Sequence, residues 1–489
     1  MRLLNSILVF LVALSMTSAS RSPISWKSDS ALVFLHRSAG LVAPENTVPA
    51  FEAAVRQGAD GVETDIRRTL DGVLVIYHDD WLLRQRGPSG KIEEMTLAET
   101  QKLDVGERFG PQWRGTRLPL FEDLLRFAKA NDLRLYLDIK TPGIYDEVLR
   151  IVRANGCMPL VHATGGQVPP NNYHLPIPWI SGWNYTEGGE EDPGKMRDVI
   201  ARAPKGVYGI MCDDARTIVR ALGRRPEKRP FMPFVSTMHS RLKAVNVLEK
   251  ERASPLKDIH AGLTSPDAKE RRRSCIALSA RPEAAAFEQL LSVAEMDTDY
   301  TVRQDACWAL GSLRDDRAAT TLLRIAKTTF DPKTAALTEY RDTFLKIAAA
   351  CALARLNSTP GRAALRTLMD SPGELDRGAA SAGIAAFGTE KDILSFVELV
   401  DTRKANDGFA AGLAIGYAGR FGNKAIPIYL AALPRDDIAK VSVFGLAALG
   451  DAAVPALRKV IADPASPSTV KHRAELAIQW IKEASSKQD

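Results

Sequence analysis

The sequence predicts an α/β domain with parallel strands, followed by an all-α domain of stacked helix pairs. Its length of 489 residues exceeds that of one ordinary domain, so we expect two. In residues 21–222, short apolar runs alternate with amphipathic segments, which is typical of strands joined by helices. Residues 223–258 form a charged, proline-containing connection. In residues 259–485, short helical segments rich in Ala and Gly recur at a nearly constant interval, which indicates a repeat.

The first twenty residues have the features of a cleaved signal peptide. They carry one positive charge at Arg2, an apolar core, and small residues at Ser18 and Ser20. The alternative is an uncleaved anchor, but the apolar run is shorter than the roughly 20 residues that a membrane-spanning helix needs. We therefore expect a mature chain that has no transmembrane segment and is secreted or periplasmic.

Residues 36–80 contain the candidate chemistry. Three apolar runs, ALVFLHR, GVETDI and VLVIYHD, each end in a residue that can bind a metal or move a proton. A helix is predicted between the first two runs, with Asn46 or Thr47 as its N-cap, Pro49 in its first turn and Gly58 at its end. Parallel strands bring their carboxyl ends to one face, where four side chains would converge. These are His36, Glu63, Asp65 and His78.

The residue types in this group suit a hard cation and proton transfer. Glu63 and Asp65 are two positions apart, so on a strand both carboxylates point to one face, where they suit Mg²⁺ or Ca²⁺. Two histidines beside such a cation could act as general base and general acid on an ester whose leaving oxygen needs a proton. Phosphodiesters meet that description.

The motifs of this stretch resemble those of the glycerophosphodiester phosphodiesterase family, which read roughly His-Arg-Gly, Pro-Glu-Asn-Thr, Glu-x-Asp and His-Asp in this order. The resemblance covers about residues 31–222 and is strong as far as Lys140. Ser38 stands in place of the motif's Gly, and Asp138 in place of a Glu. The resemblance implies an α/β TIM-like barrel, here shortened or with one irregular strand, because only seven strands are recognisable.

The resemblance also implies an activity and its residues. The activity is metal-dependent hydrolysis of glycerophosphodiesters to sn-glycerol 3-phosphate and an alcohol, with the substrate's own glycerol hydroxyl as a possible nucleophile. The catalytic histidines would be His36 and His78, preferably as base and acid in that order. The ligands of a divalent cation, Ca²⁺ or Mg²⁺, would be Glu63, Asp65 and Asp138.

Further positions match the family less closely. Arg37 and Lys140 would contact the substrate phosphate, although either could instead pair with a carboxylate of the cluster. Arg84, in the long polar segment after His78, and Trp183 would belong to a wall beside the substrate; Trp179 is an alternative for the aromatic residue. Asp213 matches the end of the family's closing strand. His162 and His174 lie outside the motifs, and we expect them to be structural.

Beyond residue 258, seven segments share a small residue at a corresponding position. The intervals between these residues are 31 or 32 positions, except for one of 43 that contains an insertion. The pattern resembles short HEAT-like repeats, which stack into an α-solenoid and could bind a protein partner. The marker residues are Ala277, Ala309, Ala352, Gly383, Ala414, Gly445 and Ala477.

Composition limits the partners. The net charge of +6 is modest, and the densest basic run, residues 269–273 (KERRR), is expected on a solvated helix face, with an anionic partner as the alternative. Because no basic stripe with interleaved aromatic residues occurs, nucleic-acid binding is not indicated. The five cysteines are widely spaced and predicted to be buried thiols, not a disulfide framework.

Two other functions remain open from the sequence. The first is an enzyme acting on choline or sphingosyl phospholipid headgroups in the manner of phospholipase D toxins. The second is a catalytically inert barrel that carries a protein-binding HEAT-like arm. Vesicle substrates test the first alternative, and stabilisation by Ca²⁺ or Mg²⁺ tests the second.

Overall fold

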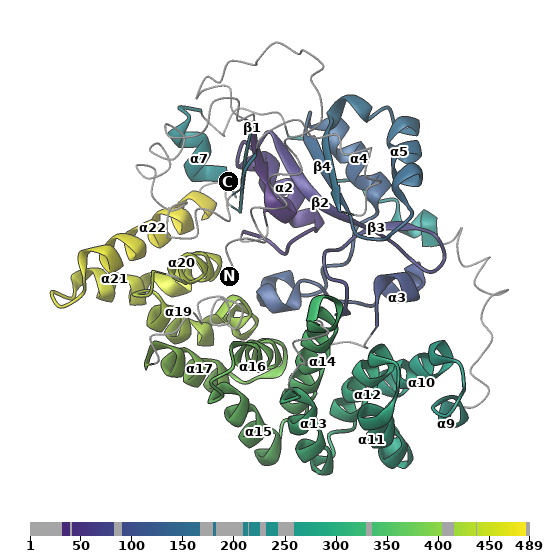
Figure 1. The fold of residues 1–489 in the computed structure, drawn as a ribbon. Coiled ribbons are helices and arrows are strands. Elements are labelled where there is room, and N and C mark those ends of the chain that lie inside the picture. Colours follow the sequence, from purple (N-terminus) through teal and green to yellow (C-terminus); the bar gives the residue numbers. More distant parts are fainter. Residues whose placement is uncertain are drawn as a thin grey trace.

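The computed structural model contains an α/β domain and an arc of helices that runs below it from α9 to α22 (Figure 1). The structure describes residues 32–39, 42–82, 90–166, 179–181, 209–213, 215–224, 231–242, 259–328, 335–402, 415–436 and 438–485. The predicted signal peptide and the predicted positions Arg84, His174 and Trp183 lie outside these residues.

Six strands of the α/β domain pair in parallel, in the order β5-β4-β2-β1-β7-β6. The parallel sheet that the sequence predicted is therefore present, and within the described residues no pairing joins β5 to β6. The strands are β1 (Leu32–Leu35), β2 (Gly61–Arg68), β4 (Arg134–Ile139), β5 (Val161–Gly166), β6 (Trp179–Ser181) and β7 (Gly209–Cys212).

The third strand runs in the opposite direction to its neighbour. β3 (Leu74–Ile76) pairs antiparallel with β2, so our expectation of a parallel strand ending at His78 is wrong. The physical reason is the short connection, which Thr69 closes by donating its backbone N–H to the carbonyl of Val73. A parallel strand would need a crossover of a dozen or more residues, whereas a hairpin needs only a turn.

Helices cover one face of the sheet and leave the other for polar side chains. In β4, Leu135, Leu137 and Ile139 are fully buried in the core beneath the helices, whereas Tyr136 and Asp138 alternate with them on the opposite face. The covering helices are α2 (Val48–Arg56), α4 (Phe121–Ala130), α5 (Tyr145–Ala154) and α7 (Ala215–Ala221).

The ends of α2 agree with the prediction. Thr47 is its N-cap, a proline lies in its first turn, and Gly58 follows it with a φ of 78°. A left-handed φ at this point favours glycine, which has no Cβ to clash with the preceding backbone.

The described part of the segment between β3 and α4 packs on a small apolar core that includes Leu82, Ile92 and Leu97. It contains η4 (Ile92–Glu94), α3 (Leu97–Thr100), η5 (Glu107–Phe109) and η6 (Pro111–Trp113). Both η5 and η6 contact η13 (Ala418–Ala425) of the helical region. The segment therefore joins the two halves of the chain.

Part of the predicted connection is packed on the α/β domain. Phe234 stacks on Phe51 of α2 with ring centroids 6.0 Å apart and also contacts Phe127 of α4. The backbone N–H of Thr237 donates to Asp123 at 2.9 Å. Residues 231–242 are thus anchored to the outer helices of the sheet.

The helical region confirms the predicted repeat. Six of the seven marker residues lie on α10, α12, α14, α16, α20 and α22, and Ala414 lies outside the described residues. A Cβ added to Gly383 would lie 2.5 Å from the carbonyl oxygen of Ala350, so small residues do allow these helices to approach closely. The helices are α9 (Ile259–Gly262), α10 (Ala268–Ala280), α11 (Phe287–Met296), α12 (Tyr300–Leu313), α13 (Ala319–Ala326), α14 (Ala335–Leu356), α15 (Thr359–Met369), α16 (Glu374–Phe387), α17 (Glu390–Thr402), α19 (Ile426–Ala432), α20 (Ala439–Ala448), α21 (Val454–Ala462) and α22 (Ser468–Ser485).

Two further properties concern the whole described chain. All five cysteines are buried free thiols, as predicted. Among the described residues, no single helix combines the length and apolar character needed to cross a bilayer; the pair Ala439–Ala448 and Gly450–Ala462 reaches them only together and is bent by 119°.

Candidate metal centre and active site

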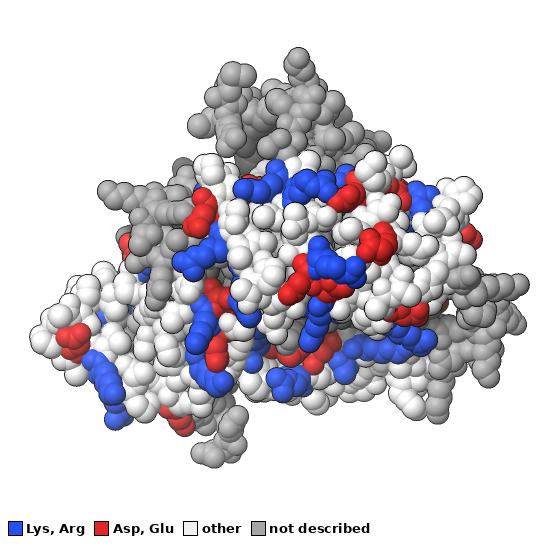
Figure 2. All heavy atoms as spheres, turned by 90° about the horizontal axis from the view of Figure 1, so that it is seen from below, with Lys and Arg blue, Asp and Glu red and all other residues white. Residues whose placement is uncertain are grey.

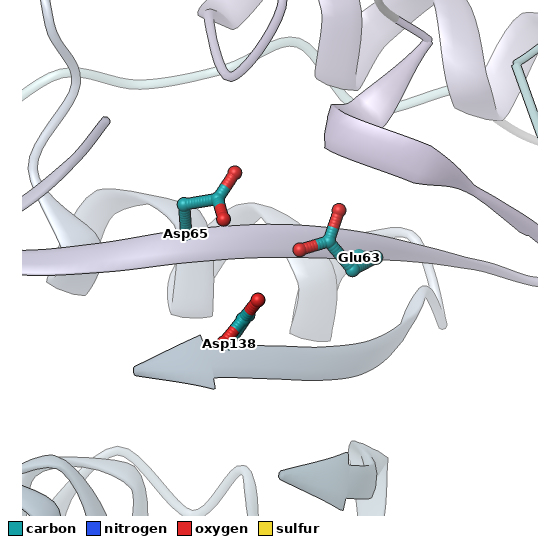
Figure 3. A group of neighbouring side chains, drawn as sticks. All are labelled: Glu63, Asp65 and Asp138. Carbon is teal, nitrogen blue, oxygen red and sulfur yellow. The ribbon is translucent and has the colours of Figure 1, made fainter. Parts of the chain in front are cut away.

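Three carboxylates meet on the sheet face opposite the helices. Glu63 and Asp65 lie two positions apart on β2 and therefore share one face of the sheet. Asp138 lies on the neighbouring β4, opposite Asp65 in the strand register. Figure 3 shows the three groups turned toward one another, and one oxygen of each lies within 4.8 Å of the others. The structure therefore brings these residues together as the sequence predicted, and their role as metal ligands stays a prediction.

The cluster has the properties of a cation site. Asp65 is fully buried and Glu63 nearly so, and Asp138 Oδ1 is buried without a hydrogen-bond partner among the described residues. Burial, and then the negative charges of Asp65 and Asp138, raise the pKa of Glu63 well above its usual range. A divalent cation would neutralise this excess charge, and carboxylate oxygens are the ligands that Mg²⁺ and Ca²⁺ prefer. The donor set thus fits a hard divalent cation.

Two polar side chains hold the carboxylates in place. Asn46 Nδ2 donates to Asp65 Oδ2 at 2.6 Å. Lys140 Nζ lies 3.0 Å from Asp65 Oδ1 and 2.7 Å from Asp138 Oδ2. Burial opposes the charge of Lys140, but these two carboxylates raise its pKa on balance. Of the two roles considered for Lys140, the structure therefore shows pairing with the cluster.

A left-handed turn connects β1 to the cluster. Arg37, Ser38 and Ala39 have φ values of 47°, 61° and 82°, a costly conformation for residues with a Cβ. Ser38, which replaces the glycine of the resembled motif, donates from Oγ to the carbonyl of Glu63 at 3.1 Å. The turn also directs the backbone N–H of Arg37 to Glu63 Oε2 at 2.7 Å.

His36 is oriented by an aspartate that directly follows the neighbouring strand β7. Its Nδ1 lies 3.0 Å from Oδ1 of Asp213, which follows β7. Because a carboxylate only accepts, Nδ1 carries the proton and Nε2 carries the lone pair in the neutral ring. The other oxygen of Asp213 lies 3.1 Å from Nζ of Lys440 on α20. Burial raises the pKa of Asp213, but the Lys440 charge and the His36 bond outweigh it and hold the pKa well below its usual range.

His78 lies at the site although β3, which precedes it, runs antiparallel to β2. The hairpin returns the chain to the level of the cluster, where the Tyr77 N–H donates to the carbonyl of Asp65 at 2.9 Å. Nε2 of His78 lies 2.9 Å from Nη2 of Arg37, and Nδ1 lies 2.9 Å from Oδ1 of Asp79. Because a guanidinium only donates, Nε2 accepts and Nδ1 carries the proton. Each imidazole thus has a carboxylate on Nδ1.

A family model matches the part of the chain that carries this geometry. Residues 36–157 match the Glycerophosphoryl diester phosphodiesterase family, and residues 256–341 match HEAT repeats. The N-terminal region is a glycerophosphoryl diester phosphodiesterase family domain. The C-terminal region carries HEAT repeats. The described residues between 32 and 242 are the phosphodiesterase-family domain below, and those between 259 and 485 are the HEAT domain.

Curated relatives agree with this assignment. The chain is 35% identical over 127 residues to a glycerophosphodiester phosphodiesterase of Caldanaerobacter subterraneus, covering 25% of this chain and 52% of that protein. It is 33% identical over 153 residues to a glycerophosphodiester phosphodiesterase of Bacillus subtilis, covering 28% and 52%. The chain thus spans about half the length of these relatives.

Among solved structures, the chain is similar to the crystal structure of glycerophosphodiester phosphodiesterase from Agrobacterium tumefaciens. The TM-score is 0.34 and the identity 21%, and the match covers 39% of this chain and 99% of that chain.

The basic run of residues 269–273 is not simply a solvated face. Arg272 on α10 donates to Glu94 of the phosphodiesterase-family domain at 2.8 Å and to Asp305 of α12 at 2.9 Å. Our expectation is therefore wrong for this residue, because its charge is used between the domains. Figure 2 shows the face that lies below in Figure 1, where positive and negative side chains are interspersed.

Several site residues escaped the sequence analysis. Asn46 was read only as a helix cap, although its place in the Pro-Glu-Asn-Thr motif was a signal for a functional role. Lys440 carried no signal, because it lies 227 positions from Asp213. His162, predicted to be structural, lies in β5 with its ring centroid 6.2 Å from that of Phe34.

Proposed function

We propose that the phosphodiesterase-family domain hydrolyses glycerophosphodiesters to sn-glycerol 3-phosphate and an alcohol in a metal-dependent reaction. One observation carries the proposal: two buried carboxylates and a partly buried one converge beside Arg37, whose side chain contacts His78 and whose backbone contacts Glu63. The family match of residues 36–157 and the names of the curated relatives support this class of substrate.

The carboxylates would hold the cation. Glu63, Asp65 and Asp138 are the proposed ligands of Mg²⁺ or Ca²⁺, which would supply positive charge for the phosphate and lower the pKa of an oxygen nucleophile. Lys140 bridges two of these side chains and would be displaced toward the phosphate when the cation binds. Its positive charge then stays within the site.

His36 is suited to the role of general base. With Nδ1 donating to Asp213, its Nε2 lone pair can take the proton of the attacking hydroxyl, which is either the substrate's own glycerol hydroxyl or water. Asp213 holds the ring in this tautomer and stabilises the imidazolium that forms. These are the two functions of a carboxylate behind a catalytic histidine.

His78 is suited to the role of general acid once Arg37 has moved. The Arg37 guanidinium donates to Nε2 of His78, so the ring must lose this contact before Nε2 can carry a proton. An arriving phosphate attracts Arg37, because a guanidinium forms strong paired bonds with phosphate oxygens. Asp79 then stabilises the protonated ring, which gives its proton to the leaving alcohol oxygen as the phosphorus–oxygen bond breaks.

A substrate panel tests the proposal. Purified protein with Mg²⁺ or Ca²⁺ is incubated with glycerophosphocholine and, separately, with vesicles of choline phospholipid or sphingomyelin. We expect sn-glycerol 3-phosphate and choline from the soluble diester. Turnover of vesicles alone would favour the phospholipase D-like alternative, and turnover of neither would favour the inert barrel.

We also propose that the chain is exported and loses residues 1–20. The support is the pattern of one basic residue, an apolar core and small residues before the cleavage point. N-terminal sequencing of the mature protein from an exporting host tests it: a new terminus near Arg21 is expected, and retention of Met1 in the processed fraction would contradict export by this route.

A further inference from the structure

We infer that the HEAT domain completes the candidate active site, with Lys440 as a positioning residue that fixes Asp213 against His36. The inference rests on the proposed function for its kinetic readouts and on geometry alone for its spectroscopic one. According to this inference, the helical repeats take part in the hydrolase site itself, in addition to any partner that they bind.

The first step of the argument is that Asp213 is held at both oxygens. Oδ1 lies 3.0 Å from Nδ1 of His36, and Oδ2 lies 3.1 Å from Nζ of Lys440. A carboxylate with a single partner can rotate about its side-chain bonds, whereas one held from two sides has a defined orientation. The imidazole then inherits that orientation, because its Nδ1 proton points to Oδ1.

The second step is that the chain just after Asp213 also contacts the HEAT domain. Arg216, near the start of α7 and shortly after Asp213, lies with its guanidinium carbon 4.2 Å from the ring centroid of Trp480 and 5.9 Å from that of Phe444. Phe444 and Trp480 are buried in the HEAT domain, on α20 and α22. Arginine over aromatic rings holds this part of the phosphodiesterase-family domain against the helix that carries Lys440.

The third step is a second line of contacts from the HEAT domain to the site. Arg108 of η5 donates to the hydroxyl of Tyr417 at 2.5 Å and pairs with Glu45 at 2.7 Å. Glu45 in turn pairs with Arg37 at 3.2 Å. The residues that flank the candidate site, His36 and Arg37, are therefore each connected to the HEAT domain through one or two intervening side chains.

The ion pair between Lys440 and Asp213 is more than an isolated surface contact. The Lys440 side chain is 17% exposed and that of Asp213 is 34% exposed, so solvent screens the attraction only in part. A surface ion pair contributes little by itself, but this carboxylate is shared with a proposed catalytic imidazole. Its main effect is therefore on the geometry of proton transfer.

The test is a double-mutant cycle with matched controls. Lys440→Met removes the charge and keeps most of the side chain, Lys440→Arg keeps the charge, and Asp213→Ala removes the intermediary. Lys424→Ala is the control, because Lys424 pairs with Glu390 at an exposed site of the same domain. Melting curves of all variants establish that they fold.

We expect Lys440→Met to lower kcat about tenfold with KM changed less than about twofold, because a misoriented base slows the chemical step. Lys440→Arg should recover most of kcat, and Lys424→Ala should match the wild type. Asp213→Ala should cost about a hundredfold, and adding Lys440→Met to it should cost nothing further, since residues that act through one another are not additive.

Two kinetic results would overturn the inference. One is a Lys440→Met variant as active as Lys424→Ala, and the other is a double variant whose loss is the product of the two single losses. If the wild type hydrolyses no glycerophosphodiester, the proposed function fails, and the inference is then decided by the ring nitrogens of His36 in ¹⁵N-histidine spectra, assigned with a His36→Gln variant.

This spectroscopic readout needs no substrate. The wild type should show the Nδ1–H tautomer for His36 at a fixed pH where the ring is neutral, and Lys440→Met should show a smaller fraction of it. An unchanged tautomer ratio in Lys440→Met, beside a changed ratio in Asp213→Ala, would show that Lys440 does not position the ring.

Discussion

Arg37 donates a hydrogen bond to His78, with Nη2 of the guanidinium 2.9 Å from Nε2 of the imidazole. The guanidinium N–H therefore competes with a proton for the lone pair of Nε2, the nitrogen that would protonate a leaving group. A phosphate that draws Arg37 away would make His78 ready to act as an acid, which would couple substrate binding to the protonation of this proposed catalytic ring.

Replacement of Arg37 tests whether its guanidinium binds the substrate phosphate. Loss of a hydrogen bond from a charged group costs about 1.5–3 kcal/mol, so Arg37→Ala should lower kcat/KM by about 10- to 100-fold, mostly through KM. Arg37→Lys should recover little, because an ammonium lacks the planar pair of donors. Arg68→Ala is the control, since Arg68 is 43% exposed and pairs with Glu147. Steady-state kinetics with a KM equal to that of the control would contradict the role of Arg37.

The two histidines should be separable by the leaving group. His36→Ala and His78→Ala should each lower turnover of glycerophosphocholine by about 10²- to 10⁴-fold, whereas His472→Ala, at an exposed position of α22, should change nothing. A diester with p-nitrophenol as its leaving group needs no proton, so it should restore much of the activity of His78→Ala only. Rescue of His36→Ala in its place would reverse the two assignments.

The carboxylate cluster predicts opposite effects of one substitution with and without metal. Because Glu63, Asp65 and Asp138 repel one another, Glu63→Gln should raise the melting temperature of chelator-treated protein. The wild type should gain about 2.7 kcal/mol from a cation at 100 times its Kd, and Glu63→Gln should gain much less. Equal shifts of the two proteins in Ca²⁺ or Mg²⁺ titrations would remove Glu63 from the site.

Asp213 predicts a dependence of stability on pH. Its folded pKa lies below the ordinary value of 3.8 because Lys440 and His36 outweigh the effect of burial. Its contribution is therefore fully present above about pH 4 and is lost as pH falls through the folded pKa. The difference in urea stability between proteins with Asp213 and with Asp213→Asn, both carrying His36→Gln so that this histidine does not titrate, should stay constant from pH 5 to 8 and shrink in stronger acid. A difference that grows in acid would contradict the ion pair.

The sequence predicted the carboxylate cluster because the cluster depends on local periodicity. Alternation along a strand places Glu63 and Asp65 on one face, and parallel pairing places Asp138 beside them. The direction of β3 could not be read in the same way, since the apolar run VLVI fits a strand of either sense. The short connection after β2 contained the missing information, and it favours a hairpin.

The contacts between the HEAT domain and the phosphodiesterase-family domain could not be predicted from local sequence patterns. Lys440 lies on a helix whose own sequence indicates only packing, and its contact with Asp213 depends on how two domains dock. Arg272 shows the same limit: a run of basic residues predicts a solvated face, yet its partner Glu94 lies 178 positions away. Contacts between distant segments appear only when the fold is known.

The central claim is that Glu63, Asp65 and Asp138 share one divalent cation. A crystal structure of the protein grown with Ca²⁺ tests it most directly, by the anomalous signal of the bound ion. We expect one ion about 2.3–2.6 Å from oxygens of all three carboxylates, with Lys140 moved away from Asp65. A cluster in which Lys140 still bridges Asp65 and Asp138 and no ion binds, at Ca²⁺ concentrations that support turnover, would contradict the account.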